Sequence, residues 1–479
     1  MATVQNTQDA PLPQPSPLFD DAGPLADPQE RRVIFAALDS FRWQGRMCWV
    51  VVRTGLDDRL LQLHEDEVQG VIYAKEQPAS QALSMLLFWL FYRINSHFNT
   101  THRRRQNFYA LPSAQWQMLA VPPFSIRDTL SAVDDAIDHN ADLAEQIFLL
   151  GLSAFALPEK PPKDSEMNWQ GKAKPNDMAK AHSTIRQFYR DWSHEGFTRE
   201  VEPLLSMIIS DLAAHLSTTR TESQPPSLLL PGAGLGRVLF ELALRGFHAT
   251  GNEISYHQLF ASNFILNSTE RADQYSIYPF AHTFTNVESR ANQLRCFTIP
   301  DIHPGQAFSA RLAAGSTVGE MNMTAGDFVL SYSTPESRET FDGLVSLFFI
   351  DTAPNLIRYI ETVRNCLKVD GVWINIGPLL WHFDNRVPGG NTDEDEDGDD
   401  GQPAEAGTKT QPKPDLEDKG IGEPGSVELT DEEVVQLVSH LGFEVLSHEI
   451  LPVDSGYVQD PNSLLQNRYR CSHWVARKL

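Results

Sequence analysis

The sequence has little that would support an extracellular, metal-binding or membrane-spanning protein. Its four cysteines, Cys48, Cys296, Cys366 and Cys471, are widely separated, and no two of them form a CxxC pair. Disulfide frameworks and zinc sites depend on patterned cysteines, so we expect reduced thiols in an intracellular protein and no bound metal. The most apolar run, ALSMLLFWLFY from Ala82, has 11 residues, whereas a membrane-spanning helix needs about 20. We interpret this run as a buried helix of a soluble protein.

Positive charge is also scarce. The chain has 39 Lys and Arg residues against 63 Asp and Glu residues, which gives a formal net charge of -24. Because nucleic-acid binding needs a basic face, this balance argues against a nucleic-acid partner and favours a small molecule. Residues 1–29 are rich in Pro and Asp and lack the basic and apolar regions of a secretory signal, so we expect a disordered leader. The expected location is cytoplasmic, extending to the nucleus.

The first part of the chain has the spacing of helices. With 479 residues, 41% of them hydrophobic, the chain is long enough for two or three domains. Between residues 30 and 205, apolar side chains recur every three or four positions, which predicts a mainly helical region. Within it, MCWVVVRTGL and VQGVIYA have the composition of short strands, and residues 158–175 form a linker rich in Pro and Lys.

The pattern changes after Ser227, where short β-rich runs alternate with helical stretches. This alternation predicts an α/β domain over residues 206–479, with a mostly parallel sheet and helices on both faces. Ligands bind such sheets at the carboxyl ends of the strands, so functional residues should directly follow strands. The runs that we expect to form strands are SLLLPG, HATGNE, DFVLSY, FDGLVSLFFID, GVWINIG and HWVARK.

Residues 388–424 interrupt the α/β pattern with an acidic segment. It contains 12 acidic and three basic residues and few apolar ones, which predicts a disordered, solvated insertion. An acidic docking segment for a basic partner is the alternative interpretation. Beyond it, Thr430 and Glu433 have the spacing of a helix capping box, so the fold should resume there with a helix that runs into a strand.

A glycine loop is the strongest local indication of a ligand. Gly232, Gly234 and Gly236 form GxGxG between an expected strand and an expected helix, where backbone can approach a ligand closely. A dinucleotide loop would have another glycine where Arg237 stands, and no Gly-Lys-Ser/Thr sequence of a P-loop follows. The loop therefore favours a ligand with little or no phosphate, although the same glycines also suit a plain structural turn.

Two carboxylates extend this interpretation to a nucleoside. Glu253 lies 17 residues beyond Gly236, at the expected end of the next strand, where it can accept hydrogen bonds from both ribose hydroxyls. This combination fits the adenosine half of S-adenosylmethionine. Asp327, which we place before the DFVLSY strand, could accept from the adenine amino group, or could be a simple cap.

Several motifs together resemble the carnosine N-methyltransferase family, also called the N2227-like family. They are LLLPGAGLGR, GNEISY, SNFILN, AGDF, FFIDTAPN and VDGVWINIGPLLWHF, and the resemblance spans Ser183 to Leu479 apart from the acidic segment. It extends more weakly to earlier residues and makes 46–93 an insertion. The resemblance implies a class I Rossmann-like methyltransferase domain, preceded by helices, with S-adenosyl-L-methionine as cofactor.

The resemblance also implies roles for individual residues. Gln187 and Arg190, on what would otherwise be an ordinary amphipathic helix, are implied to close over the cofactor, and the guanidinium of Arg190 suits the methionine carboxylate. Asn467 departs from the family, in which we expect tyrosine, and this could change how the peptide part of the acceptor is held. The positions that match the family are Gly232, Glu253 and Asp327 for the cofactor and Asp351, His382, Tyr457 and Tyr469 for the acceptor.

Methyl transfer to an imidazole needs control of the tautomer more than it needs a strong base. The pKa of a free imidazole is about 6.5, so the ring is already mostly neutral at pH 7. If Asp351 accepts the N–H of one ring nitrogen, the other presents its lone pair, which implies π-methylation of carnosine to anserine. His382 would orient Asp351 or the acceptor. Without the resemblance, Asp351 could equally cap a helix from Ala353, and His382 could be a structural residue at a strand end.

Three other functions remain open from the sequence. A histidine within a protein could be the acceptor instead of carnosine. An NAD(P)-dependent oxidoreductase could use a similar sheet, although the glycine pattern disfavours it. A non-catalytic adaptor is disfavoured because Glu253, Asp327, Asp351 and His382 are all present. The resemblance also suggests a homodimer, with the early helices at its interface.

Overall fold

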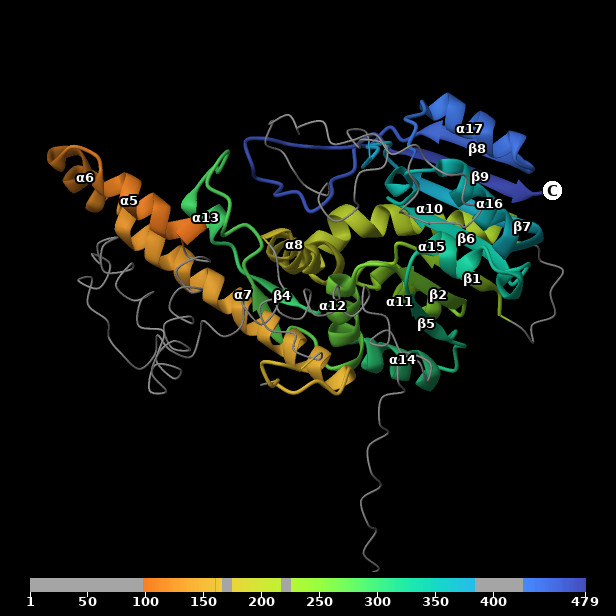
Figure 1. The fold of residues 1–479 in the computed structure, drawn as a ribbon, viewed down its shortest axis with the longest axis horizontal. Helices are drawn as coiled ribbons and strands as arrows, with labels where there is room; N and C mark the ends of the chain where they lie inside the picture. The colour runs from red at the N-terminus through yellow and green to blue at the C-terminus, as the bar shows by residue number, and fades with distance from the viewer. Residues whose placement is uncertain (1–97, 160, 166–174, 217–224, 384–424) are drawn as a thin grey trace, which may run out of the picture.

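The computed structural model describes residues 98–479 except 160, 166–174, 217–224 and 384–424 (Figure 1). Predictions for other residues lie outside this range. They include the leader, the strand-like runs and insertion within 46–93, the apolar helix from Ala82, the acidic segment and Cys48. None of the helices in the described part of the chain combines the length and apolar character needed to cross a bilayer.

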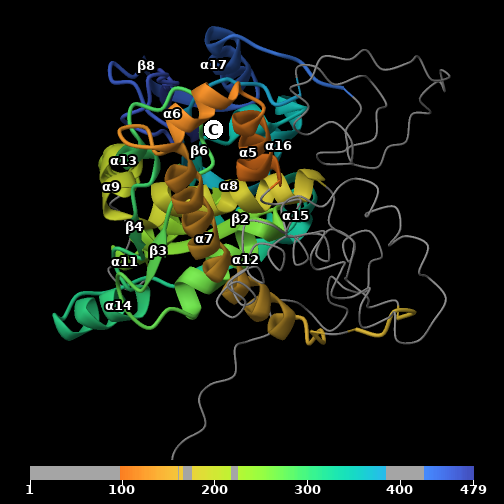
Figure 2. The same cartoon turned by 90° about the vertical axis from the view of Figure 1, so that its left-hand side faces the viewer.

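The described N-terminal part is helical, as predicted. Its longest helix, α7, is amphipathic, and the sequence from Ile126 to Ala154 buries Leu143, Ile147 and Phe148 along one side. Figure 2 views the molecule from the side on which α6 lies, and in this view α7 crosses in front of α12 and β3. The helices are α5 (Arg103–Tyr109), α6 (Ser113–Ala120), α7 (Ile126–Ala154), α8 (Pro175–Trp192), α9 (His194–Gly196) and α10 (Glu202–His215), with π-helical turns at Phe98–His102 and Phe197–Val201.

These helices share a core with the α/β part. Phe148 of α7 and Phe188 and Trp192 of α8 pack in one apolar cluster with Phe240 and Phe264, which belong to α11 and α12. Burial of a large apolar side chain contributes about 1.5–3 kcal/mol, so this cluster joins the two parts firmly. The domain boundary between 205 and 206 stays a prediction, and it falls inside α10.

The seven-stranded sheet has the order β5-β2-β1-β6-β7-β9-β8. The first five strands in this order, from β5 to β7, are parallel, and β9 runs antiparallel to both of its neighbours. The order reverses between β1 and β6, which is where ligands bind in such sheets. The predicted class I Rossmann-like fold is confirmed. The strands are β1 (Ser227–Pro231), β2 (His248–Glu253), β5 (Met321–Ala325), β6 (Phe341–Leu347), β7 (Leu367–Gly377), β8 (Phe443–Ile450) and β9 (Ser472–Lys478).

Helices cover both faces of the sheet because successive side chains of its inner strands are apolar on both sides. On β7, Ile374 packs towards α10 and α11, whereas Trp373 packs towards α16 and α17. The remaining elements are α11 (Arg237–Leu244), α12 (Tyr256–Asn267), α13 (Arg290–Gln293), α14 (Pro304–Ala313), α15 (Phe328–Tyr332), α16 (Leu356–Cys366) and α17 (Asp431–His440), turns at Pro335–Ser337 and Ile350–Thr352, and a hairpin of β3 (Tyr275–Ile277) and β4 (Phe297–Ile299).

One strand prediction was wrong. DFVLSY is helix α15, and the neighbouring strand is β5, which ends before it at Ala325. The side chain of Asp327 accepts the Leu330 N–H at 3.0 Å and so caps the helix. Phe328 and Tyr332 then fall on one buried side, at helical spacing. The sequence of β5, MNMTA, lacks a strong apolar run because the strand lies at the sheet edge.

The predicted capping box at Thr430 is confirmed. The Thr430 side chain accepts the Glu433 N–H, and the Glu433 carboxylate accepts the Thr430 N–H at 2.8 Å. This arrangement satisfies two helix-end donors together and fixes the start of α17. The helix then runs into β8, as the sequence predicted.

Arg237 joins α8, α11 and the segment after β4. It is buried, and its guanidinium binds the carboxylates of Glu241 at 3.0 Å and Asp301 at 2.6 Å. It also donates to the backbone oxygen of Asp191 at 3.0 Å. The residue that replaces a dinucleotide glycine in the loop motif is therefore the centre of a structural ion-pair network.

We predict that Arg237→Ala lowers the free energy of unfolding by about 3–5 kcal/mol, because it removes the buried guanidinium from Asp301 and leaves the buried Glu241 with Arg245 alone. The matched control is Arg358→Ala, which removes the exposed pair with Glu361 and should cost about 0–1 kcal/mol. Urea titration followed by circular dichroism measures both. Equal losses for the two variants would contradict the role of Arg237.

Candidate functional site

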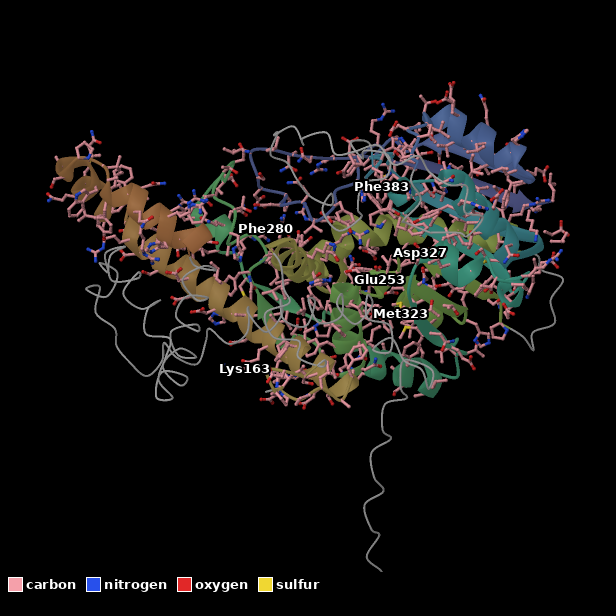
Figure 3. The ribbon with its side chains drawn as sticks, in the orientation of Figure 1. Lys163, Glu253, Phe280, Met323, Asp327 and Phe383 are labelled. Carbon is pink, nitrogen blue, oxygen red and sulfur yellow. The ribbon has the colours of Figure 1, made fainter. Side chains whose placement is uncertain are left out.

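Five of the predicted site segments end neighbouring parallel strands. The glycine loop follows β1, Glu253 ends β2, and Asp327 lies two residues beyond β5. Asp351 follows β6, and His382 follows β7. Because these strands are parallel, all five segments lie along one edge of the sheet, where Figure 3 shows Glu253 and Asp327. The prediction that functional residues directly follow strands is consistent with this arrangement.

The glycine loop has a backbone conformation and close contacts that residues with a Cβ atom would not fit. Gly232 and Gly234 have φ values of +66° and +57°, in the left-handed region that glycine tolerates. A Cβ atom at Gly232 would lie 2.7 Å from the ring of Phe349. The Ala233 N–H donates to the Asn252 oxygen at 3.0 Å, so β2 holds the loop in place. Gly236 precedes α11, also with positive φ.

Glu253 links the loop to the end of β2. Its Oε2 accepts the Gly234 N–H at 3.0 Å and its Oε1 accepts the Ser255 N–H at 2.8 Å. Burial raises the pKa of Glu253, and these N–H groups partly offset the rise. A carboxylate has about four lone-pair sites, so Glu253 keeps capacity to accept hydrogen bonds from a ribose.

Asp327 lies beside Glu253 but has a local partner. Ala325 pairs with Glu253 across β5 and β2, and the Gly326 N–H donates to the Glu253 backbone oxygen at 3.0 Å. The Asp327 carboxylate caps α15 through Leu330. The structure therefore places it two residues after a strand rather than before one, and its adenine-binding role stays a prediction.

Arg190 lies near the end of α8, which docks against the glycine loop. The Trp192 indole donates to the Leu235 oxygen at 3.0 Å and fixes this end of the helix. The Arg190 guanidinium binds Asp191 at 2.7 Å, while its buried Nε has no hydrogen-bond partner. The same Nε lies 3.9 Å from Glu200 Oε2, an ion pair without a hydrogen bond, so the guanidinium keeps capacity to donate to an anionic ligand group. Gln187, three residues earlier on the helix, is half-buried.

The two tyrosines that the resemblance assigns to the acceptor both lie near an aromatic residue that the sequence analysis missed. The ring of Phe348 lies 5.3 Å from that of Tyr457 and 6.1 Å from that of Tyr469, between ring centroids. The guanidinium carbon of Arg190 lies 4.8 Å from the Tyr457 centroid. The structure thus brings Arg190 and both tyrosines together. The position of Phe348, directly after the apolar β6 strand, was the signal that could have identified it.

Asp351 is buried, with 3% of its surface exposed. Its Oδ2 accepts the Leu380 N–H at 3.0 Å, and its backbone oxygen accepts the His382 N–H at 3.1 Å. Burial raises the pKa of Asp351, and the Leu380 N–H and the nearby His382 partly offset the rise. The alternative of Asp351 as a helix cap is wrong. The residue that caps α16 is Asn355, whose side-chain oxygen accepts the Arg358 N–H at 3.4 Å.

His382 and Asn467 are exposed. The backbone N–H of His382 donates to the Asp351 backbone oxygen at 3.1 Å and fixes His382 beside Asp351. The backbone N–H of Asn467 donates to Gln459 at 3.0 Å within the β8–β9 connection. The structure therefore places Asn467 on the rim and does not bring its side chain to Asp351.

The residues along this edge fit S-adenosylmethionine. Glu253 has acceptor capacity for a ribose, the glycine loop offers close backbone approach, and the Nε of Arg190 makes no hydrogen bond. In the described part of the chain, no group of three or more His, Cys, Asp or Glu side chains could hold a metal ion. Cys296, Cys366 and Cys471 are free thiols.

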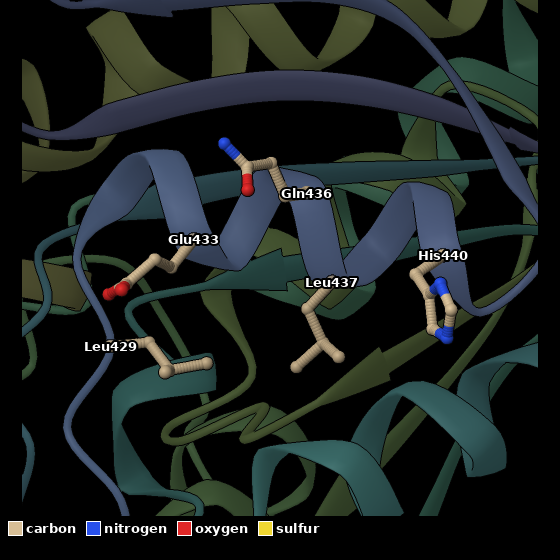
Figure 4. A pocket seen from close by; sticks show the side chains of 5 residues that line it. All are labelled: Leu429, Glu433, Gln436, Leu437 and His440. Atoms are coloured by element: carbon tan, nitrogen blue, oxygen red, sulfur yellow. The ribbon is translucent and has the colours of Figure 1, made fainter.

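An open groove on α17 is separate from these residues. Its volume is about 390 Å³, and Leu429, Glu433, Gln436, Leu437 and His440 line it (Figure 4). The Glu433 carboxylate is already bound to Thr430 in the capping box. None of the predicted site residues lines this groove.

Comparison with known proteins identifies relatives along most of the chain. Residues 167–479 match the family model for carnosine N-methyltransferase. The carnosine N-methyltransferase of Schizosaccharomyces pombe is 34% identical over 348 residues, which cover 73% of this chain and 82% of the relative. That of Rattus norvegicus is 32% identical over 399 residues, which cover 82% and 86%.

Solved methyltransferase structures are more distant. An S-adenosylmethionine-dependent methyltransferase from Methanosarcina mazei is 16% identical, with a TM-score of 0.31, and the match covers 56% of this chain and 96% of the other. The predicted resemblance, enzyme class and cofactor are confirmed by the family match, and the oxidoreductase and adaptor alternatives are not favoured. The chain therefore belongs to the carnosine N-methyltransferase family, whose members are S-adenosylmethionine-dependent enzymes.

Proposed function

We propose that this protein methylates the π-nitrogen of the carnosine imidazole and so produces anserine. The observation that carries the proposal is the buried carboxylate of Asp351, which follows β6 three residues after Phe348. A buried carboxylate is unfavourable unless it is satisfied, and the Leu380 N–H occupies only one of its acceptor positions, so Asp351 keeps capacity to accept from a ligand. The family membership supports the choice of acceptor.

S-adenosylmethionine, when bound, supplies an electrophilic methyl group on a sulfonium. Asp351 would accept the N–H of the ring nitrogen remote from the acceptor backbone, which leaves the lone pair on the nearer nitrogen. As positive charge develops on the imidazole, the same carboxylate would stabilise it in a site of low polarity. The His382 backbone fixes Asp351 from the β7 side. The chain thus needs no strong base.

On the cofactor side, three groups would hold the nucleoside and amino-acid parts. Glu253 would accept from the ribose, and Arg190 would donate to the carboxylate. Asp327 would accept from the adenine amino group with the capacity that its helix-capping bond leaves. Positioning of both reactants is a main source of acceleration in such transfers.

Asp351→Asn should lower kcat for carnosine by about 100-fold or more, because an amide neither fixes the tautomer reliably nor carries the stabilising charge. Transfer of label from S-adenosylmethionine to carnosine measures this. Asp454→Asn, an exposed change in the β8–β9 connection, is the control and should leave kcat within about twofold. Full activity of Asp351→Asn would contradict the mechanism.

The same substitution should stabilise the ligand-free protein at neutral pH. Because burial raises the pKa of Asp351 above its ordinary 3.8, the folded state binds the proton more tightly than the unfolded state. Ionisation therefore costs stability as the pH rises from the ordinary to the raised pKa. We expect Asp351→Asn to raise Tm by about 1–3 °C at pH 7 and to lose this advantage below about pH 4. A lower Tm at pH 7 would contradict this prediction.

Arg190→Lys should weaken S-adenosylmethionine binding by about tenfold or more, because lysine lacks the planar fork and the unpartnered Nε donor. Calorimetry measures the affinity without turnover. Arg245→Lys, directly after α11, is the control, since it changes an arginine paired with Glu241 outside the site. Equal affinities for both variants would remove Arg190 from the cofactor site.

We also propose that the protein is an intracellular homodimer that uses α5 and α6. Exposed apolar side chains on and beside these helices support this, and the two helices lie at the end of the molecule opposite the sheet (Figure 1). They are Tyr109, Leu111, Met118, Val121 and Phe124.

Light scattering after size exclusion tests the dimer. The wild type should have the mass of two chains, and Met118→Glu combined with Val121→Glu should have the mass of one, because burying two carboxylates is unfavourable. Leu312→Glu changes an exposed apolar residue of α14 and should leave the mass unchanged. A single-chain mass for the wild type would exclude the dimer.

A further inference from the structure

One buried carboxylate, Glu200, holds the loop that carries Tyr457. Glu200 lies in the π-helical turn between α9 and α10, and only 5% of its surface is exposed. Its Oε2 accepts the Val458 N–H at 2.7 Å, and its Oε1 accepts the Gln459 N–H at 2.8 Å. Both oxygens therefore bind successive N–H groups of a segment more than 250 residues away in the chain.

At this contact, Val458 has an unfavourable backbone conformation. Val458 has a φ of +53°, and a β-branched residue is rarely stable in the left-handed region. Successive N–H groups in such a turn point to one side and form a small anion-binding concavity. The Glu200 carboxylate occupies that concavity. A Cβ atom at Gly456 would lie 2.9 Å from Glu200 Oε1, so glycine there permits the close approach.

The same carboxylate faces the cofactor side of the site. Its Oε2 lies 3.9 Å from the Nε of Arg190, whose guanidinium covers the Tyr457 ring. Arg186, one turn earlier on α8, donates to the Val458 oxygen at 3.4 Å. Burial raises the pKa of Glu200, while the charge of Arg190 and the two loop N–H groups partly offset the rise.

We propose that Glu200 is a positioning residue for methyl transfer, which fixes the Tyr457 loop against α8 and so sets the acceptor side of the site. It touches neither the proposed acceptor nor the reacting atoms. The inference rests on the proposed function for its effect on turnover, but the hold on the loop is independent of that function. Two measurements therefore separate the two ideas.

The first variant is Glu200→Gln. The amide keeps one acceptor but places an N–H₂ group against the second loop N–H, so both bonds cannot form. The control is Glu241→Gln, which alters another buried glutamate in an arginine network on α11. Hydrogen–deuterium exchange should be faster by about tenfold or more in the peptide containing Val458 and Gln459 for Glu200→Gln only.

The kinetic readout uses carnosine as the acceptor. We expect Glu200→Gln to raise its KM by about tenfold, while the dissociation constant of S-adenosylmethionine changes by less than about threefold, since Arg190 keeps its pair with Asp191. Glu241→Gln should lower stability without this separation. Gly456→Ala, a loop change that displaces the carboxylate without removing it, should reproduce the KM effect and the faster exchange.

The outcomes discriminate clearly. Faster exchange with a raised KM in both Glu200→Gln and Gly456→Ala supports the proposal. Exchange and KM that change no more than in Glu241→Gln overturn it, as does faster exchange with an unchanged KM. If the wild type does not methylate carnosine, the proposed function fails, while selective faster exchange in the two variants still supports the hold of Glu200 on the loop.

Discussion

The site depends on the docking of α8 against the glycine loop. Arg190 comes from a helix that precedes the sheet in the chain, and nothing in the β-strand order brings it to the edge where β1 and β6 diverge. Two buried contacts do so: the Trp192 indole donates to the loop oxygen of Leu235, and Arg237 donates to the Asp191 oxygen. Because Arg237 starts α11, the loop, the helix that follows it and α8 are fixed as one unit.

Carboxylates that are unfavourable to bury are concentrated at this edge. Burial raises the pKa of Glu253 and Asp351, and in each case nearby donors or positive charges offset only part of the rise. The folded protein therefore gives up stability as the pH rises through the range between the ordinary and raised pKa values. Elsewhere, buried acids such as Glu241 have direct arginine partners. The contrast indicates that the edge residues are arranged for ligands.

The sequence predicted the parts of this arrangement that depend on local patterns. Short β-rich runs located β1, β2, β6, β7 and β9, and the spacing of Thr430 and Glu433 located the start of α17. DFVLSY was assigned to a strand because its residues favour strands, yet the cap formed by Asp327 and the burial of one helical side decided the outcome. Edge strand β5 and the β3–β4 hairpin were missed because they are short or half-exposed and have weak patterns.

Among the site residues, too, those that depend on a local pattern could be predicted, and those that depend on contacts between distant segments could not. Residues directly after strands, such as Glu253 and Asp351, could be proposed from position and chemistry. Phe348 was missed although it directly follows β6. Glu200 could not be proposed, because its role arises from a contact between distant segments. The hydrogen bond that the Val458 N–H donates to Glu200 joins residues 258 positions apart, and no local spacing indicates it. Arg237 was interpreted only as the absence of a glycine, whereas its partners come from three different elements.

The acceptor side is rigid where it would meet the imidazole and open where it would meet the rest of the acceptor. Phe348 and Val458 both have positive φ, and each is fixed by hydrogen bonds from outside its own turn: Phe348 by Ile376 on β7, and Val458 by Glu200. The rings of Phe348 and Tyr457 are thus set by the backbone as well as by contact with each other. Asn467 is exposed, as Tyr457 is, but its backbone N–H binds Gln459 within the same β8–β9 connection. Discrimination for the ring should therefore reside in the rigid part, and discrimination for the peptide part in side chains that can be exchanged without altering the fold.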